Sequence, residues 1–220
     1  LPISSRISHA DLRAVAAAAS ADGTEPREIL LGIDEANLAP FSIDPLEEPL
    51  LYLYGDADSG KSSMLRGVVH EITRLYGPTE AKIFVVDYRR ALLGEIPQDY
   101  LGAYLTSHEL AEGGIGELAA FFRSRIPGPD VTPEQLRTRS WWTGAEGFVL
   151  VDDYDLVATS QGNPIAPLAL LLAQAADLGL HVILTRRTGG ASRAAYDPII
   201  QRMTDLGATG ILLSGNPEEG

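Results

Sequence analysis

The sequence contains no cysteine, and only two of its 17 basic residues are lysines. Without cysteine, neither disulfide bonds nor thiolate metal sites can form, and a reducing compartment is expected. The four histidines have no spacing typical of a metal site, so we expect surface or hydrogen-bonded core histidines. No apolar stretch in the sequence reaches the length needed to span a bilayer.

The 30 acidic residues also outnumber the 17 basic ones, which gives the chain a net charge of −13. A non-specific DNA-binding protein needs a lysine- and arginine-rich face that neutralises phosphates. The charge therefore argues against nucleic acid as the main partner.

The 220 residues, of which 45% are hydrophobic, suffice for one well-packed domain with a short extension. Residues 1–25 are expected to form a lead-in, with an alanine-rich helix at Asp11–Ala19 and then a polar, turn-rich segment. Residues 26–220 are expected to form the main domain. The chain begins at Leu1, without a start methionine or a signal peptide, and we expect it to be part of a larger protein.

Apolar strand-like runs alternate with helix-like patterns through the main domain, which predicts an α/β fold with a mostly parallel sheet and helices on both faces. Two short runs near the start predict an N-terminal edge hairpin. The nearly continuous apolar character of the central runs is typical of strands buried on both faces. The expected hairpin strands are 28–33 and 38–43, the later strands 82–86, 148–151, 181–184 and 210–213, and the helices 110–125, 165–178 and 197–206.

The strongest single motif is Gly55–Ser63, which reads G-x-x-x-x-G-K-S, the phosphate loop of P-loop NTPases. It lies between a strand-like run at Leu50–Tyr54 and a helix-like pattern that continues to Leu75, which is the context that this loop requires. Glycine permits backbone N–H groups to curl around a polyphosphate, and the following helix N-terminus favours an anion. The sequence therefore predicts a site for ATP and Mg²⁺.

Two side chains of the loop have specific expected roles. Lys61 is expected to reach the β- and γ-phosphates as a point charge, and the Ser62 hydroxyl to bind Mg²⁺. The expected nucleotide-binding residues are Gly55, Asp58, Ser59, Gly60, Lys61, Ser62 and Ser63.

A metal-binding acid is expected at the end of a buried strand, and Phe148–Val151 is followed by Asp152. Asp152 is expected to hold Mg²⁺ through water, opposite Ser62. The next residue in many such ATPases is a glutamate that orients the attacking water, whereas here it is Asp153, one methylene shorter. Because a small misplacement slows catalysis, Asp153 is expected to be a weak base, with slow turnover.

Thr185 and the two arginines that follow it end another strand at the same carboxyl edge of the sheet. Thr185 is a candidate sensor of the γ-phosphate, and Arg186 is a candidate arginine finger across a subunit boundary. Surface arginines at a strand end are an equally good interpretation, and the same two alternatives apply to Arg89–Arg90. Trp141–Trp142 fit a core or packing face better than a ligand platform.

Several segments together resemble the FtsK/SpoIIIE-type ATPases, and most of all the third, C-terminal ATPase domain of the EccC motors of type VII (ESX) secretion. The resemblance covers the chain from about Glu28 to its end. The phosphate loop is generic, whereas Asp87–Arg90 and Asp152–Asp155 narrow the resemblance to that domain. The supporting segments are Leu31–Asp34, Ala39–Pro40 with Asp44, Tyr54–Ser63, Val85–Arg90, Val151–Asp155 and His181–Thr185.

The resemblance implies a P-loop ATPase domain at the cytoplasmic face of the cell membrane, next to other ATPase domains of the same chain. It implies binding of the C-terminal signal of small WXG-type helical-hairpin export substrates, and a hexamer in the full motor. It also implies that the nucleotide site is often degenerate, in agreement with Asp153. The resemblance also implies a proline-, glycine- and arginine-containing segment beyond the last strand, which is not among residues 214–220.

We therefore expect an ATP-binding domain that binds export substrates and regulates or drives their translocation, with weak or conditional hydrolysis. One alternative is a DNA-translocating FtsK-type motor domain, which shares the fold. A second alternative is a non-hydrolysing module in which the nucleotide has a structural role.

Overall fold

The computed structural model describes residues 8–19, 28–34, 39–189 and 197–213. Its centre is a sheet of six strands in the order β5-β4-β6-β7-β3-β8, in which every neighbouring pair is parallel. This confirms the predicted parallel α/β sheet. The strands are β3 (Leu50–Tyr54), β4 (Ala81–Val86), β5 (Leu101–Leu105), β6 (Glu146–Val151), β7 (Leu180–Arg186) and β8 (Thr209–Leu212).

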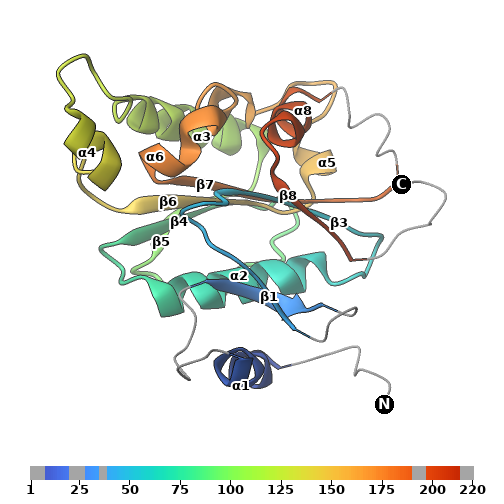
Figure 1. Cartoon of the computed structure of the whole chain (residues 1–220). Coiled ribbons are helices and arrows are strands. Elements are labelled where there is room, and N and C mark those ends of the chain that lie inside the picture. Colours follow the sequence, from blue (N-terminus) through green and yellow to red (C-terminus); the bar gives the residue numbers. More distant parts are fainter. Residues whose placement is uncertain (1–7, 20–27, 35–38, 190–196, 214–220) are drawn as a thin grey trace.

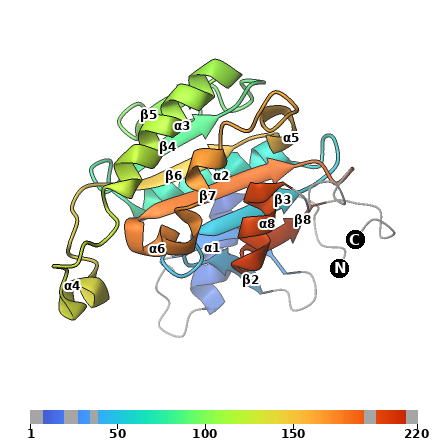
Figure 2. The same cartoon turned by 90° about the horizontal axis from the view of Figure 1, so that it is seen from above.

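Helices cover both faces of this sheet (Figure 1). One face carries α2 (Lys61–Leu75), and the other carries α3 (His108–Arg123), α6 (Ala175–Leu178) and α8 (Pro198–Asp205). The view from above shows α3 over the half of the sheet that contains β4, α6 near the start of β7, and α8 toward β3 and β8 (Figure 2). The central strands are therefore buried on both faces, which explains their nearly continuous apolar sequence.

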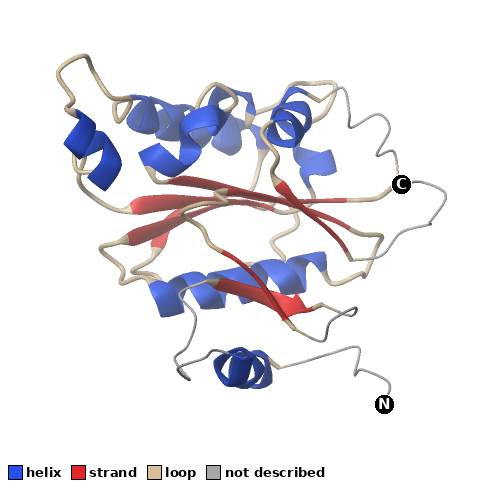
Figure 3. Ribbon diagram, in the orientation of Figure 1, coloured by secondary structure: helices blue, strands red, loops and turns tan. Residues whose placement is uncertain are grey.

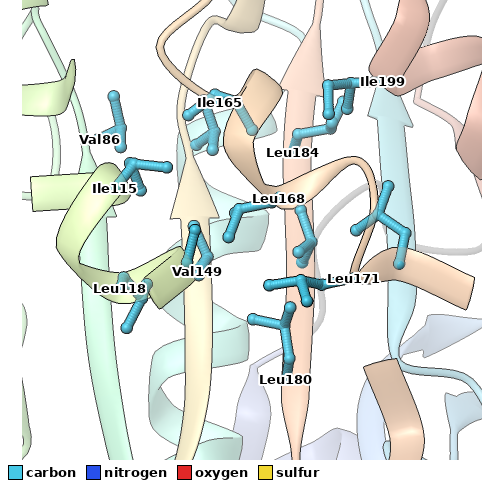
Figure 4. Close-up of a cluster of buried hydrophobic side chains, with 14 of the residues drawn as sticks. Val86, Ile115, Leu118, Val149, Ile165, Leu168, Leu171, Leu180, Leu184 and Ile199 are labelled. Atoms are coloured by element: carbon cyan, nitrogen blue, oxygen red, sulfur yellow. The ribbon is translucent and has the colours of Figure 1, made fainter. Parts of the chain in front are cut away.

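Alternate side chains of each central strand enter two separate cores. Val149 and Val151 of β6 join the core under α3, whereas Phe148 and Leu150 join the core over α2. The close-up of the first core shows leucines of the 165–178 segment packed on β6 and β7 (Figure 4). Close packing of both cores fixes the positions of the strands relative to one another. The candidate site lies along the carboxyl ends of these strands.

The predicted hairpin is present as β1 (Ile29–Ile33) and β2 (Pro40–Ile43), which pair antiparallel. It is not an edge of the central sheet, because the two strands form a separate sheet that packs beneath α2 (Figure 3). Ile29 and Leu31 enter the core that α2 shares, and the resulting burial replaces pairing with the main sheet.

The predicted lead-in helix is α1 (His9–Ala19), and it packs on the hairpin through Leu12 and Ala16 against Leu30. The predicted domain boundary near residue 25 lies outside the described residues, and it stays a prediction.

Three predictions of secondary structure need correction. The single helix expected at 165–178 is broken into two 3₁₀ turns, η1 (Ala166–Leu168) and η2 (Leu172–Gln174), followed by the short α6. Pro167 has no N–H group to donate to a helical ladder, and Gly179 ends α6 with a positive φ of 69°. Strand β5 and the one-turn helix α5 (Tyr154–Val157) were not predicted.

Another short helix, α4 (Pro133–Thr138), begins after Thr132. Its capping box is complete, because Thr132 accepts a hydrogen bond from the backbone of Gln135 and the Gln135 side chain accepts one in return.

Candidate functional site: the phosphate loop and its acidic partners

The phosphate loop runs from the end of β3 to the start of α2, as the sequence predicts. The Gly55 N–H donates to the carbonyl of Arg186 at the end of β7, so the loop begins at the carboxyl ends of the strands. A Cβ at Gly55 would lie 2.2 Å from Ser59 Oγ, a distance that excludes any larger residue without a shift of the loop. Gly60 has a φ of 98° and Asp58 one of 59°, so the loop closes through left-handed conformations.

The N-terminus of α2 presents the features of an anion site. Gly60 caps the helix without any side-chain hydrogen bond, and the first turn contains no acidic residue. The first N–H groups of a helix have no partner within the helix, and the helix dipole adds positive potential there. Lys61 is 6% exposed, and its ammonium group donates to the carbonyls of Gly55 (3.0 Å) and Asp56 (2.8 Å).

Asp152, which follows β6, lies against the start of α2. Ser62 Oγ donates to one carboxylate oxygen of Asp152 at 2.7 Å, and Thr185 Oγ1 donates to the other, also at 2.7 Å. Burial raises the pKa of Asp152 above its ordinary value, and the two hydroxyl donors lower it in part. Three elements distant in sequence, β6, β7 and α2, therefore meet at one carboxylate.

Asp153 has a different environment from its neighbour. Its backbone is left-handed, with a φ of 48°, and its N–H donates to Thr185 Oγ1 at 2.9 Å. Its carboxylate accepts a hydrogen bond from Arg89 Nη1 at 3.0 Å and lies 4.0 Å from the Lys61 ammonium. The candidate base therefore lies between two cations at the phosphate loop.

An open cavity of about 410 Å³ lies over the loop. It is lined by residues 57–63, Arg89, Asp153 and Arg187. All the predicted nucleotide-binding residues except Gly55 contribute to this lining, while Gly55 shapes the start of the loop and Asp152 lies beneath it.

The structure places Arg186 differently from Arg187. Arg186 is at the end of β7 but does not line this cavity. Burial raises the pKa of the Tyr54 and Tyr154 phenols, and the charge of Arg186 opposes this rise in part. Arg187 lines the cavity, and its side chain lies 3.8 Å from Asp155. A role of Arg186 across a subunit boundary stays a prediction.

Two residues of the site were not assigned from the sequence: Asp87 was given no role, and the role of Arg89 was left undecided. Asp87 is buried at the end of β4 and accepts hydrogen bonds from the N–H groups of Arg89 (3.1 Å) and Leu92 (2.8 Å) and from the Tyr104 hydroxyl. The signal available in the sequence was an acid at the end of a buried strand, followed by Tyr88 and then two arginines.

The donor set fits a polyphosphate with a divalent cation. A loop of backbone N–H groups at a helix N-terminus, with the Lys61 ammonium beside it, fits phosphate oxygens. Ser62 and Asp152 supply the hard oxygen ligands that Mg²⁺ prefers. The Ser59 hydroxyl of the loop is buried and has no hydrogen-bond partner within the described part of the chain, so a phosphate oxygen would satisfy it.

His181 and Trp142, for which the sequence predicted no role in the site, pack near the opposite ends of the strands. His181 is 1% exposed, stacks on Phe148 and pairs with Glu146, so it is a hydrogen-bonded core histidine. Trp142 packs against the Arg125 guanidinium at 3.8 Å, in agreement with a packing face. Among the described residues, no helix combines the length and apolar character needed to cross a bilayer.

Comparison with known proteins identifies the family. Over 192 residues, the chain is 45% identical to the ESX secretion system protein EccC of Thermomonospora curvata, a match that covers 87% of this chain and 14% of that relative. A solved structure described as an ATPase matches 99% of this chain and 85% of its own, with 31% identity and a TM-score of 0.89. The chain belongs to the EccC family of ATPases.

A solved structure of an EccC protein contains a bound peptide. Thermomonospora curvata EccC (ATPases 2 and 3) in complex with a signal sequence peptide has a TM-score of 0.86 and 42% identity, over 95% of this chain and 38% of that chain. This chain spans about one seventh of the length of that curated EccC relative. No protein-family model matches the chain.

Proposed function

We propose that this EccC-type domain binds ATP with Mg²⁺ at the phosphate loop. The observation that carries the proposal is the shared carboxylate of Asp152, which accepts hydrogen bonds from Ser62 and Thr185 directly beneath the loop that holds Lys61. A buried carboxylate beside a hydroxyl at a helix N-terminus is the arrangement that a hydrated Mg²⁺ on a polyphosphate requires.

The residues have separate roles in this proposal. Lys61, which donates to the carbonyls of Gly55 and Asp56, would bind the β- and γ-phosphates, and Ser62 and Asp152 would hold the metal. Bound Mg²⁺ supplies charge neutralisation at the phosphates. Asp153 is the candidate acceptor of the proton from the attacking water, and its short side chain makes turnover slow or conditional.

We further propose that the domain belongs to a type VII secretion motor at the cytoplasmic face of the membrane. The family membership supports this assignment, and the related EccC complex with a signal sequence peptide supports binding of the C-terminal signal of small WXG-type substrates. Neighbouring ATPase domains of the same chain and a hexameric full motor are proposed on the same basis.

The first experiment replaces Lys61 by alanine and measures Mg-ATP binding by titration calorimetry. We expect a loss of affinity of at least about 100-fold, because a charge-assisted contact to phosphate is removed at a partly enclosed site. Lys82→Ala is the matched control, because Lys82 is the other lysine of the chain and contacts the Asp99 carbonyl away from the loop.

Unchanged affinity in Lys61→Ala, with a folded protein by circular dichroism, would rule out nucleotide binding at this loop. Equal losses in Lys61→Ala and Lys82→Ala would point to a general charge effect instead.

A further inference from the structure

The carboxylate of Asp153 forms an ion pair with an arginine that follows another strand. Arg89, which follows β4, donates to it at 3.0 Å, and the Lys61 ammonium lies 4.0 Å away on the other side. The Asp153 side chain is 8% exposed, whereas that of Arg89 is 58% exposed. The acid is therefore fixed within the cavity, and the arginine reaches it from the solvent side.

The backbone of Arg89 is held in place by Asp87. The buried Asp87 carboxylate accepts the N–H groups of Arg89 and Leu92, and it is held in turn by the Tyr104 hydroxyl of β5. Arg90 continues this turn in a left-handed conformation, with a φ of 57°. The fold thus presents the Arg89 side chain at the cavity mouth through a turn that Asp87 holds, where it is partly exposed and pairs with Asp153.

We propose that Arg89 is a positioning residue that restrains Asp153 and thereby limits ATP hydrolysis at this site. A carboxylate that accepts a proton from water needs a free lone pair directed at that water, and a charge-assisted hydrogen bond occupies one. Slow turnover then has two causes, the short side chain of Asp153 and its pairing with Arg89.

This inference rests on the proposed function, because it concerns hydrolysis of the nucleotide bound at the same loop. It differs from a second role open to a cavity-lining arginine, which is direct contact with a phosphate. Loss of a phosphate contact weakens nucleotide binding and lowers kcat, whereas loss of a restraint on Asp153 leaves binding unchanged and raises kcat.

The test uses Arg89→Gln, Asp153→Asn and the double variant of the chain. In the ligand-free protein, thermal unfolding is expected to show non-additive shifts of Tm, because the two side chains interact. In Arg89→Gln, the Kd for Mg-ATP by calorimetry is expected to stay within about twofold, and kcat from phosphate release to rise about two- to fivefold, as a partly exposed ion pair allows. In the Asp153→Asn background, Arg89→Gln is expected to leave kcat unchanged.

Arg137→Gln is the matched control, because it removes an exposed arginine–carboxylate pair with Glu134 on α4, far from the loop. A kcat that falls or does not change in Arg89→Gln overturns the inference, as does turnover below detection in both proteins. A tenfold weaker Kd, additive Tm shifts, or a rise in kcat that persists without the Asp153 carboxylate also overturns it. Absence of Mg-ATP binding to the unaltered chain would instead overturn the proposed function.

Discussion

Four consecutive residues, Asp152 to Asp155, have four different partners. Asp152 binds hydroxyl groups, Asp153 pairs with Arg89, Tyr154 donates to Asp197 at the start of α8, and Asp155 accepts from the backbone of Arg187. Strand β6 ends and α5 begins within this segment, so successive side chains point in different directions. A single sequence motif therefore connects the phosphate loop, β4, α8 and the end of β7.

Glu146, at the opposite end of β6, provides a test that is independent of the nucleotide site. Burial raises the pKa of Glu146, but the hydrogen bond with His181 and the charges of His181 and Arg139 outweigh this and hold it below the ordinary value of 4.5. A lowered folded-state pKa means that this carboxylate stabilises the fold at pH values above 4.5. The contribution is lost as the pH falls through the lower, folded-state value.

We expect Glu146→Gln to lower the free energy of unfolding by about 1 kcal/mol at pH 7, and by less as the pH falls below 4.5. Urea unfolding at several pH values measures this difference. Glu134→Gln is the control, because the Glu134 side chain is 66% exposed and its ion pair should contribute little. A difference that grows toward low pH would contradict this account.

At the scale of elements, the approach of α3 to the sheet depends on Gly147 in β6. A Cβ there would lie 2.6 Å from Phe122 of α3, whose ring is fully buried. The absence of a side chain lets this large ring pack directly on the strand, close to where β6 begins. The position of β6 in turn determines where Asp152 and Asp153, which follow its other end, lie relative to the phosphate loop.

We expect Gly147→Val to destabilise the fold by about 1–3 kcal/mol, because an overpacked core displaces Phe122. Gly113→Ala is the matched control: Gly113 lies in α3 with open space at its Cβ position, and alanine there should stabilise the helix by about 0.5–1 kcal/mol. Chemical denaturation measures both changes. Equal stability of Gly147→Val and the unaltered chain would show that the ring has room to move.

The correct and incorrect predictions of elements have a common physical basis. Strands β3, β4 and β6 are buried on both faces, so their apolar runs were evident from the sequence. Strand β5 lies at the sheet edge and contains Gly102, so its run is neither continuous nor alternating. The leucine-rich 165–178 segment was predicted as one helix because it is apolar, although packing on β6 and β7 favours separate turns.

At the scale of the whole molecule, charge distinguishes two classes of partner. The net charge of −13 opposes association with a polyanion over the distance of a Debye length. A short peptide that docks by apolar and hydrogen-bonding contacts is not subject to the same barrier.

We expect negligible retention of the chain on immobilised DNA at about 50 mM salt, a condition that favours electrostatic binding to nucleic acid. We expect measurable binding of the C-terminal peptide of a WXG-type substrate under the same conditions, followed by fluorescence anisotropy. A scrambled peptide of equal charge is the control. Salt-dependent DNA binding would instead favour a DNA-translocating motor domain.

The sequence by itself determined the phosphate loop, the acid-terminated strand and the alternation of strands and helices. Each of these depends on residues that are neighbours in the chain, such as Gly60 with Lys61 or Val151 with Asp152. Only the tertiary structure placed β7 between β3 and β6, which brings Thr185 to the Asp152 carboxylate beneath Ser62. It also brought Arg89 from β4 to Asp153, since pairing across strands depends on the order that packing imposes on the sheet.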